Sequence, residues 1–287
     1  MPNPIPPAAS PPTKSPRVLA LCNGKGGSNK TTGSLNLSAE LATRGFTVLL
    51  IDLDQAGDAT KSLAPADYPW NGTTEEVLFG STRLGESIVP TALPTLWLLP
   101  ADKHMRGLEQ RLLKDRPYDF AQLLKNVLTQ QAGAFDYVVL DCPGSLDALT
   151  VVALVASHAF VVPCEPEYFS FDGAKAMLEV AENLTRQNLT PDLQFAGLFF
   201  SPYNPRKRNS GIQVKVVKAA HKLFPGQVFS NVREDAGIRL SQVERIPLVK
   251  LDPNARAVAD FRLLTTEIIE AIERGQQVNQ QVNQQVN

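Results

Sequence analysis

Short apolar runs alternate with longer stretches of mixed polarity along most of the chain. The first run, residues 17–23, is almost continuously apolar, whereas residues 33–45 carry Leu35, Ala39 and Ala42 at helical spacing before a glycine. A strand with one solvated face would alternate apolar and polar residues, so continuous runs predict strands that are buried on both faces. The pattern predicts such strands at residues 17–23, 46–54, 96–101, 136–143, 158–164 and 194–201.

Buried strands that are separated by helices predict an α/β fold, with a doubly wound, mostly parallel β-sheet flanked by helices. Ligands of such sheets bind beside the carboxyl ends of the strands. Three of the predicted strands end at Asn23, Asp54 and Asp141. We therefore expect these side chains at one edge of the sheet, where a binding site would form.

The two ends of the chain differ in composition from the middle. Residues 1–16 are rich in proline and lack a periodic apolar pattern, which predicts a disordered arm. The motif QQVN occurs three times in residues 276–287, which predicts a frayed tail of low complexity. Between them, residues 17–275 are expected to form one domain.

Composition excludes several classes of protein. Net charge is −1, with 43% hydrophobic and 20% charged residues, so no overall charge draws the chain to nucleic acid or membrane. The three cysteines, Cys22, Cys142 and Cys164, are too scattered for a disulfide framework or a metal cluster, and we interpret them as reduced core thiols of a cytoplasmic protein. No apolar run reaches transmembrane length.

A glycine-rich segment, GKGGSNKT at residues 24–31, connects the first strand to the first helix. A phosphate loop needs glycines for close backbone approach, a helix N-terminus behind them, a lysine and a hydroxyl. Lys30 would reach the β- and γ-phosphates of a nucleotide, and Thr31, with Thr32 beside it, would bind Mg²⁺. An ordinary glycine-rich turn is the alternative, but the order of strand, loop and helix favours the phosphate loop.

Asp54 and Asp141 allow two interpretations. A carboxylate at a strand end can cap the following helix or turn. It can also hold the magnesium shell or orient an attacking water. Two carboxylates on the same predicted edge as a phosphate loop favour the second interpretation.

Lys25 makes the loop more specific, because a general phosphate loop requires no lysine at that position. The segment KGGSNKTT is similar to the deviant Walker A motif, KGGxxK[TS], of the ParA/MinD superfamily. The segments LLIDLDQAGDAT (49–60) and DYVVLDCPGS (136–145) resemble its second motif and its Walker B strand. The segments VVPCEPEYFSFDG (161–173) and IPLVKLDPNARAVADFRLL (246–264) also resemble superfamily segments, so the resemblance covers residues 17–274.

The resemblance implies a P-loop NTPase fold that binds ATP and Mg²⁺ and forms a homodimer in the ATP state. In the superfamily, the lysine at the position of Lys25 crosses the dimer interface to the partner's phosphates. The aspartate at Asp54 positions the hydrolytic water, and the one at Asp141 lies near magnesium. The implied nucleotide-binding residues are Gly24, Lys25, Gly26, Gly27, Ser28, Asn29, Lys30, Thr31 and Thr32. The implied catalytic residues are Lys25, Lys30 and Asp54, and the implied metal ligands are Thr31 and Asp141.

Two positions depart from the superfamily pattern. Gly144 stands where a second proline is usual, and Asn29 replaces the glycine before the catalytic lysine. That glycine commonly has a positive φ, and asparagine is the other residue that tolerates the left-handed region best. We expect the loop to form, with the Asn29 side chain near the γ-phosphate and intrinsic hydrolysis weak. A nucleotide-binding regulator or scaffold with little or no hydrolysis is the alternative function.

Positive charge is concentrated in residues 201–250, which hold ten Lys/Arg against three Asp/Glu, a net charge of +7 that leaves −8 for the rest of the chain. Such asymmetry is typical of a nucleic-acid surface, although a solvated helix face is the alternative. Lysine and arginine with few aromatic residues nearby favour contacts to phosphates over readout of bases. The candidate DNA-binding residues are Arg206, Lys207, Arg208, Lys215, Lys218 and Lys222.

The composition of the last predicted helix, residues 260–274, distinguishes between branches of the superfamily. It carries more acidic than basic residues, which anionic lipid would repel, so its apolar stripe is expected to dock on the core. The sequence most resembles the short, Soj-like ParA proteins. This implies a cytoplasmic, nucleoid-associated partition ATPase for a chromosome, plasmid or other cargo, with non-specific duplex DNA and a ParB-like stimulating protein as partners and no membrane.

Overall fold

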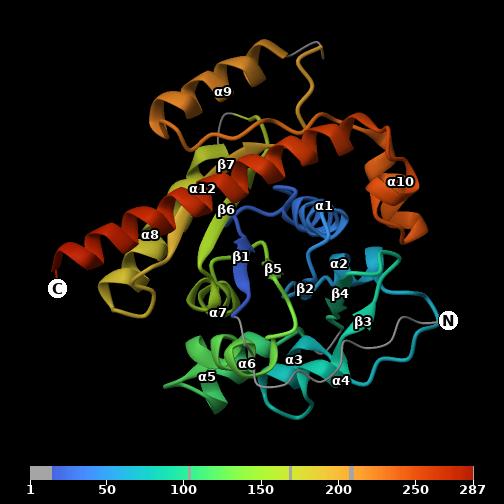
Figure 1. The fold of residues 1–287 in the computed structure, drawn as a ribbon, viewed down its shortest axis with the longest axis vertical. Coiled ribbons are helices and arrows are strands. Elements are labelled where there is room, and N and C mark those ends of the chain that lie inside the picture. The colour runs from blue at the N-terminus through green and yellow to red at the C-terminus, as the bar shows by residue number, and fades with distance from the viewer. Residues whose placement is uncertain (1–14, 103–104, 168–169, 207–209, 287) are drawn as a thin grey trace.

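A single sheet with the strand order β3-β4-β2-β5-β1-β6-β7 forms the centre of the molecule (Figure 1). The computed structural model describes residues 15–102, 105–167, 170–206 and 210–286. Every strand pair is parallel except β3 with β4. The strands are β1 (Arg17–Leu21), β2 (Val48–Asp52), β3 (Val89–Pro90), β4 (Leu96–Leu99), β5 (Tyr137–Asp141), β6 (Ala159–Cys164) and β7 (Gln194–Phe200).

The order confirms the predicted doubly wound, mostly parallel α/β fold, and all six predicted strands are present. Strand β3 was not predicted, because its two residues are too short to show a period. The helices are α1 (Lys30–Thr43), α2 (Asp58–Leu63), α3 (Thr74–Leu78), α4 (Leu84–Ser87), α5 (Leu108–Asp115), α6 (Leu123–Gln131), α7 (Ala148–Ala156), α8 (Ser170–Arg186), α9 (Ser210–Leu223), α10 (Ala236–Glu244), α11 (Leu248–Leu251) and α12 (Arg256–Val286).

Helices cover both faces of the sheet, so the strands are apolar on both faces along most of their length. Along β1, Leu19 and Leu21 join the core under α1, α2 and α12, whereas Val18 and Ala20 join the core under α5 to α9. All four side chains are at most 3% exposed. The continuous apolar runs of the sequence are therefore the result of burial on two faces.

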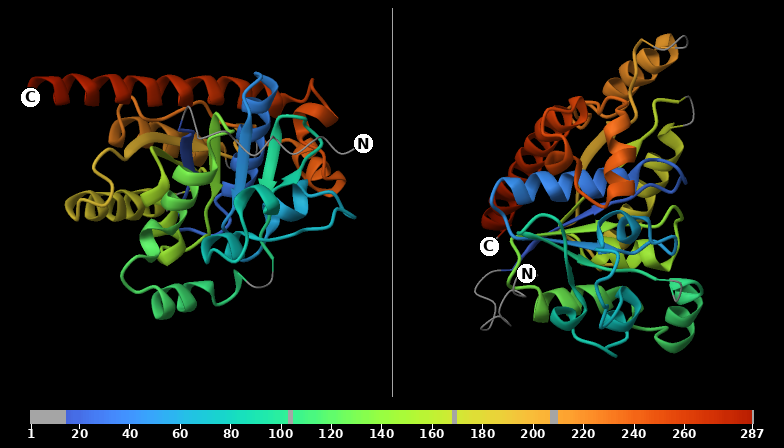
Figure 2. Two further views of the ribbon diagram at one scale, coloured as in Figure 1. Left: turned by 60° about the horizontal axis from the view of Figure 1, so that its bottom comes forward. Right: turned by 90° about the vertical axis from the view of Figure 1, so that its right-hand side faces the viewer.

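Helix α12 differs from the prediction at its C-terminal end. Its apolar stripe docks on the core as expected, but the helix continues through the QQVN repeats to Val286 instead of ending near Gly275 (Figure 2). Gly275 packs so closely on Gln194 that a Cβ would lie 2.1 Å from its Oε1, and Gln194 Nε2 donates to the Ala271 carbonyl at 2.8 Å. The repeats contain no proline and are rich in glutamine, a good helix former.

The predicted proline-rich arm lies outside the described residues up to position 14, as does Asn287 at the other end. Among the residues that the structure describes, no helix is both long enough and apolar enough to span a membrane. The three cysteines are buried and form no disulfide, which confirms their prediction as core thiols.

Candidate nucleotide site and basic surface

The glycine-rich segment joins β1 to α1 at the centre of the sheet, where β1 lies between β5 and β6. Helix α1 begins at Lys30, earlier than the predicted start at residue 33. Two residues with positive φ shape the loop, Gly27 at 76° and Asn29 at 63°. The expectation that Asn29 would occupy the left-handed region is confirmed, and the loop forms without a glycine there.

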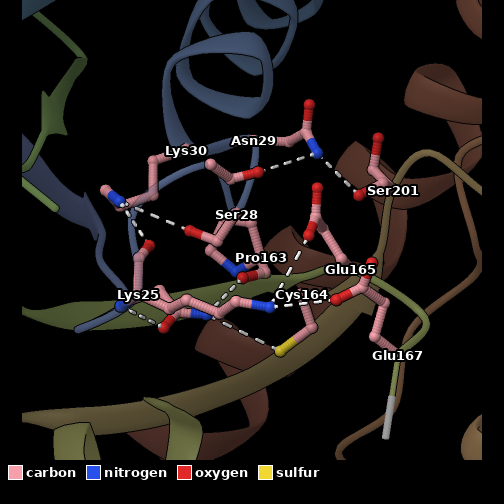
Figure 3. A network of polar contacts seen from close by, with 11 residues as sticks. Lys25, Ser28, Asn29, Lys30, Pro163, Cys164, Glu165, Glu167 and Ser201 are labelled. Atoms are coloured by element: carbon pink, nitrogen blue, oxygen red, sulfur yellow. Dashed lines mark hydrogen bonds and ion pairs between the residues drawn. The ribbon is translucent and has the colours of Figure 1, made fainter. Parts of the chain in front are cut away.

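Lys30 lies inside the loop. Only 6% of the residue is exposed, and its ammonium donates to the Lys25 carbonyl at 3.2 Å and to Ser28 Oγ at 3.3 Å (Figure 3). Both acceptors are neutral oxygens of the loop itself. The positive charge is therefore held at the loop's interior, where a phosphate-binding lysine is needed.

Thr31 and Asp141, the two predicted metal ligands, lie close to each other. The Asp141 carboxylate, at the end of β5, accepts a hydrogen bond from Ser34 Oγ at 3.0 Å, and the nearby Thr31 side chain acts to lower its pKa. Its Oδ2 is buried and has no hydrogen-bond partner among the described residues. A buried, unsatisfied carboxylate oxygen beside a hydroxyl is a donor set that suits Mg²⁺. Thr32 points elsewhere, because its Oγ1 accepts from Gln242 of α10 at 3.5 Å.

Asp52 is a site residue that the sequence prediction missed. It ends β2 directly opposite Asp141 of β5, and both residues are fully buried. Burial raises the pKa of Asp52 to about 6, and burial together with the charge of Asp52 raises the pKa of Asp141 well above its usual range. The signal was present in the sequence, because the apolar run VLLID ends at Asp52, two residues before the aspartate that the motif emphasised.

Asp54 lies beyond the end of β2, on the loop that leads to α2. Its backbone N–H donates to Asp52 Oδ1 at 3.1 Å, and its own Oδ1 accepts from the Ala56 N–H at 2.9 Å. Asp52 is held in turn by Thr60, through the hydroxyl at 2.6 Å and the N–H at 2.9 Å. The buried Asp52 carboxylate therefore fixes the position of the loop that carries the partly exposed Asp54 carboxylate.

Lys25 lies at the rim of the loop and faces carboxylates of its own chain (Figure 3). Its Nζ is 3.2 Å from Glu167 Oε2 and 3.7 Å from Glu165 Oε2, both in the segment after β6. The hydrogen bond to Glu167 is the main reason that the pKa of Lys25 is raised. The Lys25 side chain is 39% exposed, so it lies at the surface and is paired.

Backbone acceptors hold the Asn29 side chain. Its Nδ2 donates to the Ser201 carbonyl at 2.8 Å and to the Gly27 carbonyl at 3.4 Å, on the opposite side of the loop from the Lys30 ammonium (Figure 3). The expected proximity of this side chain to the γ-phosphate stays a prediction. The acceptor at the end of β7 is a backbone carbonyl, which the sequence pattern did not reveal.

Tight contacts fix the segments that surround the glycine-rich loop. Asn23 Nδ2 donates to the Pro163 carbonyl at 2.7 Å, and its Oδ1 accepts from the Lys25 N–H at 2.9 Å. A Cβ on Gly173 would lie 2.0 Å from that Oδ1, so only glycine fits there. A Cβ on Gly144 would lie 3.2 Å from Gly26 Cα, which shows how closely the segment after Asp141 approaches the loop.

The predicted basic surface is described in part. Lys215, Lys218 and Lys222 are exposed on α9, which stands at the β7 edge of the molecule (Figure 1). None of the three forms an ion pair with another described residue. Arg206 is exposed at the start of the preceding loop, whereas Lys207 and Arg208 lie outside the described residues.

Known proteins are similar to this chain in sequence and in fold. A family profile, AAA_31, described as an AAA domain, matches residues 16–195. The chromosome partitioning protein ParA of Myxococcus xanthus is 30% identical over 88% of this chain and 88% of its own. The sporulation initiation inhibitor protein Soj of Bacillus subtilis is 31% identical over 88% of this chain and 98% of its own. The crystal structure of cobyrinic acid a,c-diamide synthase from Mycobacterium smegmatis, with a bound ATP analogue and magnesium, has a TM-score of 0.74 at 27% identity and covers 91% of this chain and 97% of that chain.

Proposed function

This chain belongs to the ParA/MinD superfamily of ATPases, in its Soj-like ParA branch. From that premise, we propose that it is a partition ATPase whose ATP-bound homodimer binds duplex DNA without sequence preference. The dimer would position a chromosome, plasmid or other cargo on the nucleoid of the cytoplasm. A ParB-like partner would stimulate hydrolysis and release from DNA. The observation that carries the proposal is the glycine-rich loop with the buried Lys30 and, at the end of β5, the buried Asp141 carboxylate whose Oδ2 has no hydrogen-bond partner among the described residues.

The residues around the loop have separate roles in this proposal. The loop amides and Lys30 would bind the phosphates of ATP, and Thr31 and Asp141 would hold Mg²⁺, which would supply positive charge beside the phosphate oxygens. The unsatisfied Asp141 Oδ2 is the atom that supports this assignment. Asp54, placed by its hydrogen bond to Asp52, orients the attacking water toward the γ-phosphate.

Dimer formation requires a change at Lys25. In the single chain its ammonium is paired with Glu165 and Glu167. To bind the phosphates of a partner's nucleotide, it must leave these carboxylates and cross the interface. Attraction to a polyphosphate would offset the loss of the ion pairs, which are partly exposed and therefore weak. ATP bound to the partner subunit thus supplies a new anion for Lys25, which otherwise pairs with carboxylates of its own subunit.

The DNA-binding proposal rests on α9. Its lysines are exposed and form no ion pairs within the described structure, while the rest of the chain is acidic. Contacts from lysine to phosphate would release counterions, so affinity should fall steeply with rising salt. Arg206, Lys207 and Arg208, which precede α9 in the sequence, would extend the same surface.

The proposal is tested by ATP turnover and DNA binding measured on the same preparation. Wild type with Mg²⁺, duplex DNA and the cognate partner should hydrolyse ATP, and Asp54→Ala should bind ATP but not hydrolyse it. DNA of any sequence should bind with ATP, and the triple change of Lys215, Lys218 and Lys222 to Glu should weaken binding equally across sequences. Nucleotide binding without turnover under any condition would favour the alternative, a regulator or scaffold that does not hydrolyse ATP.

A further inference from the structure

The Asn29 side chain connects two parts of the chain that are distant in sequence. Its Nδ2 lies 2.8 Å from the carbonyl oxygen of Ser201, the residue that follows β7 (Figure 3). A glycine at this position could adopt the same φ of 63°, but it has no side-chain donor. The asparagine therefore adds a hydrogen bond between the glycine-rich loop and the end of β7.

The acceptor belongs to a well-held segment. Ser201 is 2% exposed, and its N–H donates to the Cys164 carbonyl of β6 at 2.9 Å. Just beyond it, the Tyr203 N–H donates to the Val232 carbonyl at 2.8 Å, and the Asn204 N–H donates to Gln213 Oε1 of α9 at 2.9 Å. A short path of hydrogen bonds and backbone thus leads from Asn29 to the helix with the exposed lysines.

We propose that Asn29 is a positioning residue that couples the glycine-rich loop to the segment 201–204, so that nucleotide in the loop changes the setting of α9. The part of this inference that concerns DNA rests on the proposed function. Asn29 is adjacent to Lys30 and Thr31, so a shift of these residues on nucleotide binding moves the donor that holds the Ser201 carbonyl. Two sites are coupled when the ligand at either site changes the state of an element that both sites contact.

The chain provides a matched control at Asn188. Like Asn29 it is an asparagine with positive φ, here 58°, but it is exposed, it follows α8, and its side chain makes no hydrogen bond to another described residue. Asn188→Gly therefore reproduces the backbone change of Asn29→Gly without the loss of a tether. Asn29→Asp is a second variant, which retains tolerance of the left-handed region but places an acceptor, in place of a donor, against the carbonyl.

Amide hydrogen exchange of the full-length protein, with and without Mg²⁺ and a non-hydrolysable ATP analogue, tests the coupling. In wild type and Asn188→Gly, nucleotide should slow exchange in the glycine-rich loop and also at Tyr203 and Asn204, by about two- to tenfold at the latter two, the range expected for one hydrogen bond. In Asn29→Gly and Asn29→Asp, nucleotide should still slow exchange in the glycine-rich loop but should no longer slow it at Tyr203 and Asn204. An unchanged response at Tyr203 and Asn204 in both variants overturns the inference.

DNA binding gives an independent measurement. The ratio of duplex affinities with and without nucleotide should fall about two- to tenfold in Asn29→Gly and stay unchanged in Asn188→Gly. A ratio equal to that of wild type contradicts coupling to α9. A wild type whose loop shows no response to nucleotide overturns the proposed function itself, an outcome that is distinct from the loss of coupling in the variants.

Discussion

The interior and the rim of the glycine-rich loop hold their lysines in different ways. In the interior, Lys30 is almost fully buried and its ammonium contacts two neutral oxygens. At the rim, Lys25 is 39% exposed and its ammonium contacts two carboxylates. The interior therefore keeps its charge available for a ligand of the same subunit, whereas the charge at the rim is neutralised until a stronger anion competes for it. Under the proposed function, Lys30 in the interior would serve nucleotide binding and Lys25 at the rim would serve dimer formation.

The largest effect should come from the interior. Lys30→Ala removes the cation that faces the phosphates, so ATP affinity should fall about 100-fold or more, as expected when two charge-assisted hydrogen bonds are lost. Isothermal titration calorimetry with Mg²⁺ measures the loss. The control is Lys61→Ala, because Lys61 is an exposed lysine on α2 that pairs with Asp58 of its own helix. Equal ATP affinity in the two variants would show that the loop does not bind phosphate as described.

The next effect should come from the rim and should be of a different kind. Lys25→Ala should bind ATP within about threefold of wild type, since partly exposed ion pairs contribute little to the fold of the loop. It should not form dimers when ATP is added, as measured by analytical ultracentrifugation. A variant that dimerises with ATP like wild type would remove the distinction between the rim and the interior.

The sequence predicted most of this arrangement because the loop depends on local order. Strand, glycines, lysine, hydroxyl and helix follow one another, so Lys30 and Thr31 could be placed before the fold was known. Asp141 was predicted from a strand end, and parallel strands bring such ends to one edge of a sheet. The interior of the site is thus largely readable from residues 17–31 and 136–141.

The contacts that could not be predicted all depend on partners distant in sequence. Asn29 donates to a backbone carbonyl 172 positions away, and any residue can provide such an acceptor, so no sequence pattern marks it. Asp52 was overlooked because the register that places it opposite Asp141 is a property of the sheet. Likewise, nothing local shows that Lys25 would reach Glu165 and Glu167, which lie after another strand.

A smaller effect should appear in the stability of the interior. Asp52 and Asp141 lie opposite each other and are fully buried, and burial raises the pKa of Asp52 from an ordinary 3.8 to about 6, so folding disfavours the charged form. A carboxyl group with a raised pKa stabilises the fold fully below its unfolded pKa, and this stabilisation is lost as pH rises through the folded value. Without Mg²⁺, wild type should therefore become less stable from about pH 4 to about pH 7.

Asp141→Asn removes one of the two facing charges, so the dependence on pH should weaken. At neutral pH and in the presence of a chelator, the variant should unfold at a higher temperature than wild type. A gain of about 1 kcal/mol would correspond to roughly 2–4 °C. Thermal unfolding at about pH 5 and about pH 7.5 gives both quantities. A midpoint below that of wild type at the higher pH would contradict the idea that the pair is strained by charge.

The smallest effect should come from the carboxylates at the rim. Glu165→Gln with Glu167→Gln keeps the shape of both side chains but removes the charges that hold Lys25 in its own subunit. Since each partly exposed ion pair contributes at most about 1 kcal/mol, the ATP-dependent dimer should become roughly two- to fivefold tighter at low salt. The gain should shrink as salt rises, because exposed pairs are screened. Glu270→Gln on α12, which breaks a more exposed pair with Arg274 away from the loop, is the control and should leave the dimer unchanged. Weaker dimerisation in the double variant would mean that Glu165 and Glu167 serve the interface itself, and that the lysine at the rim is not restrained by them.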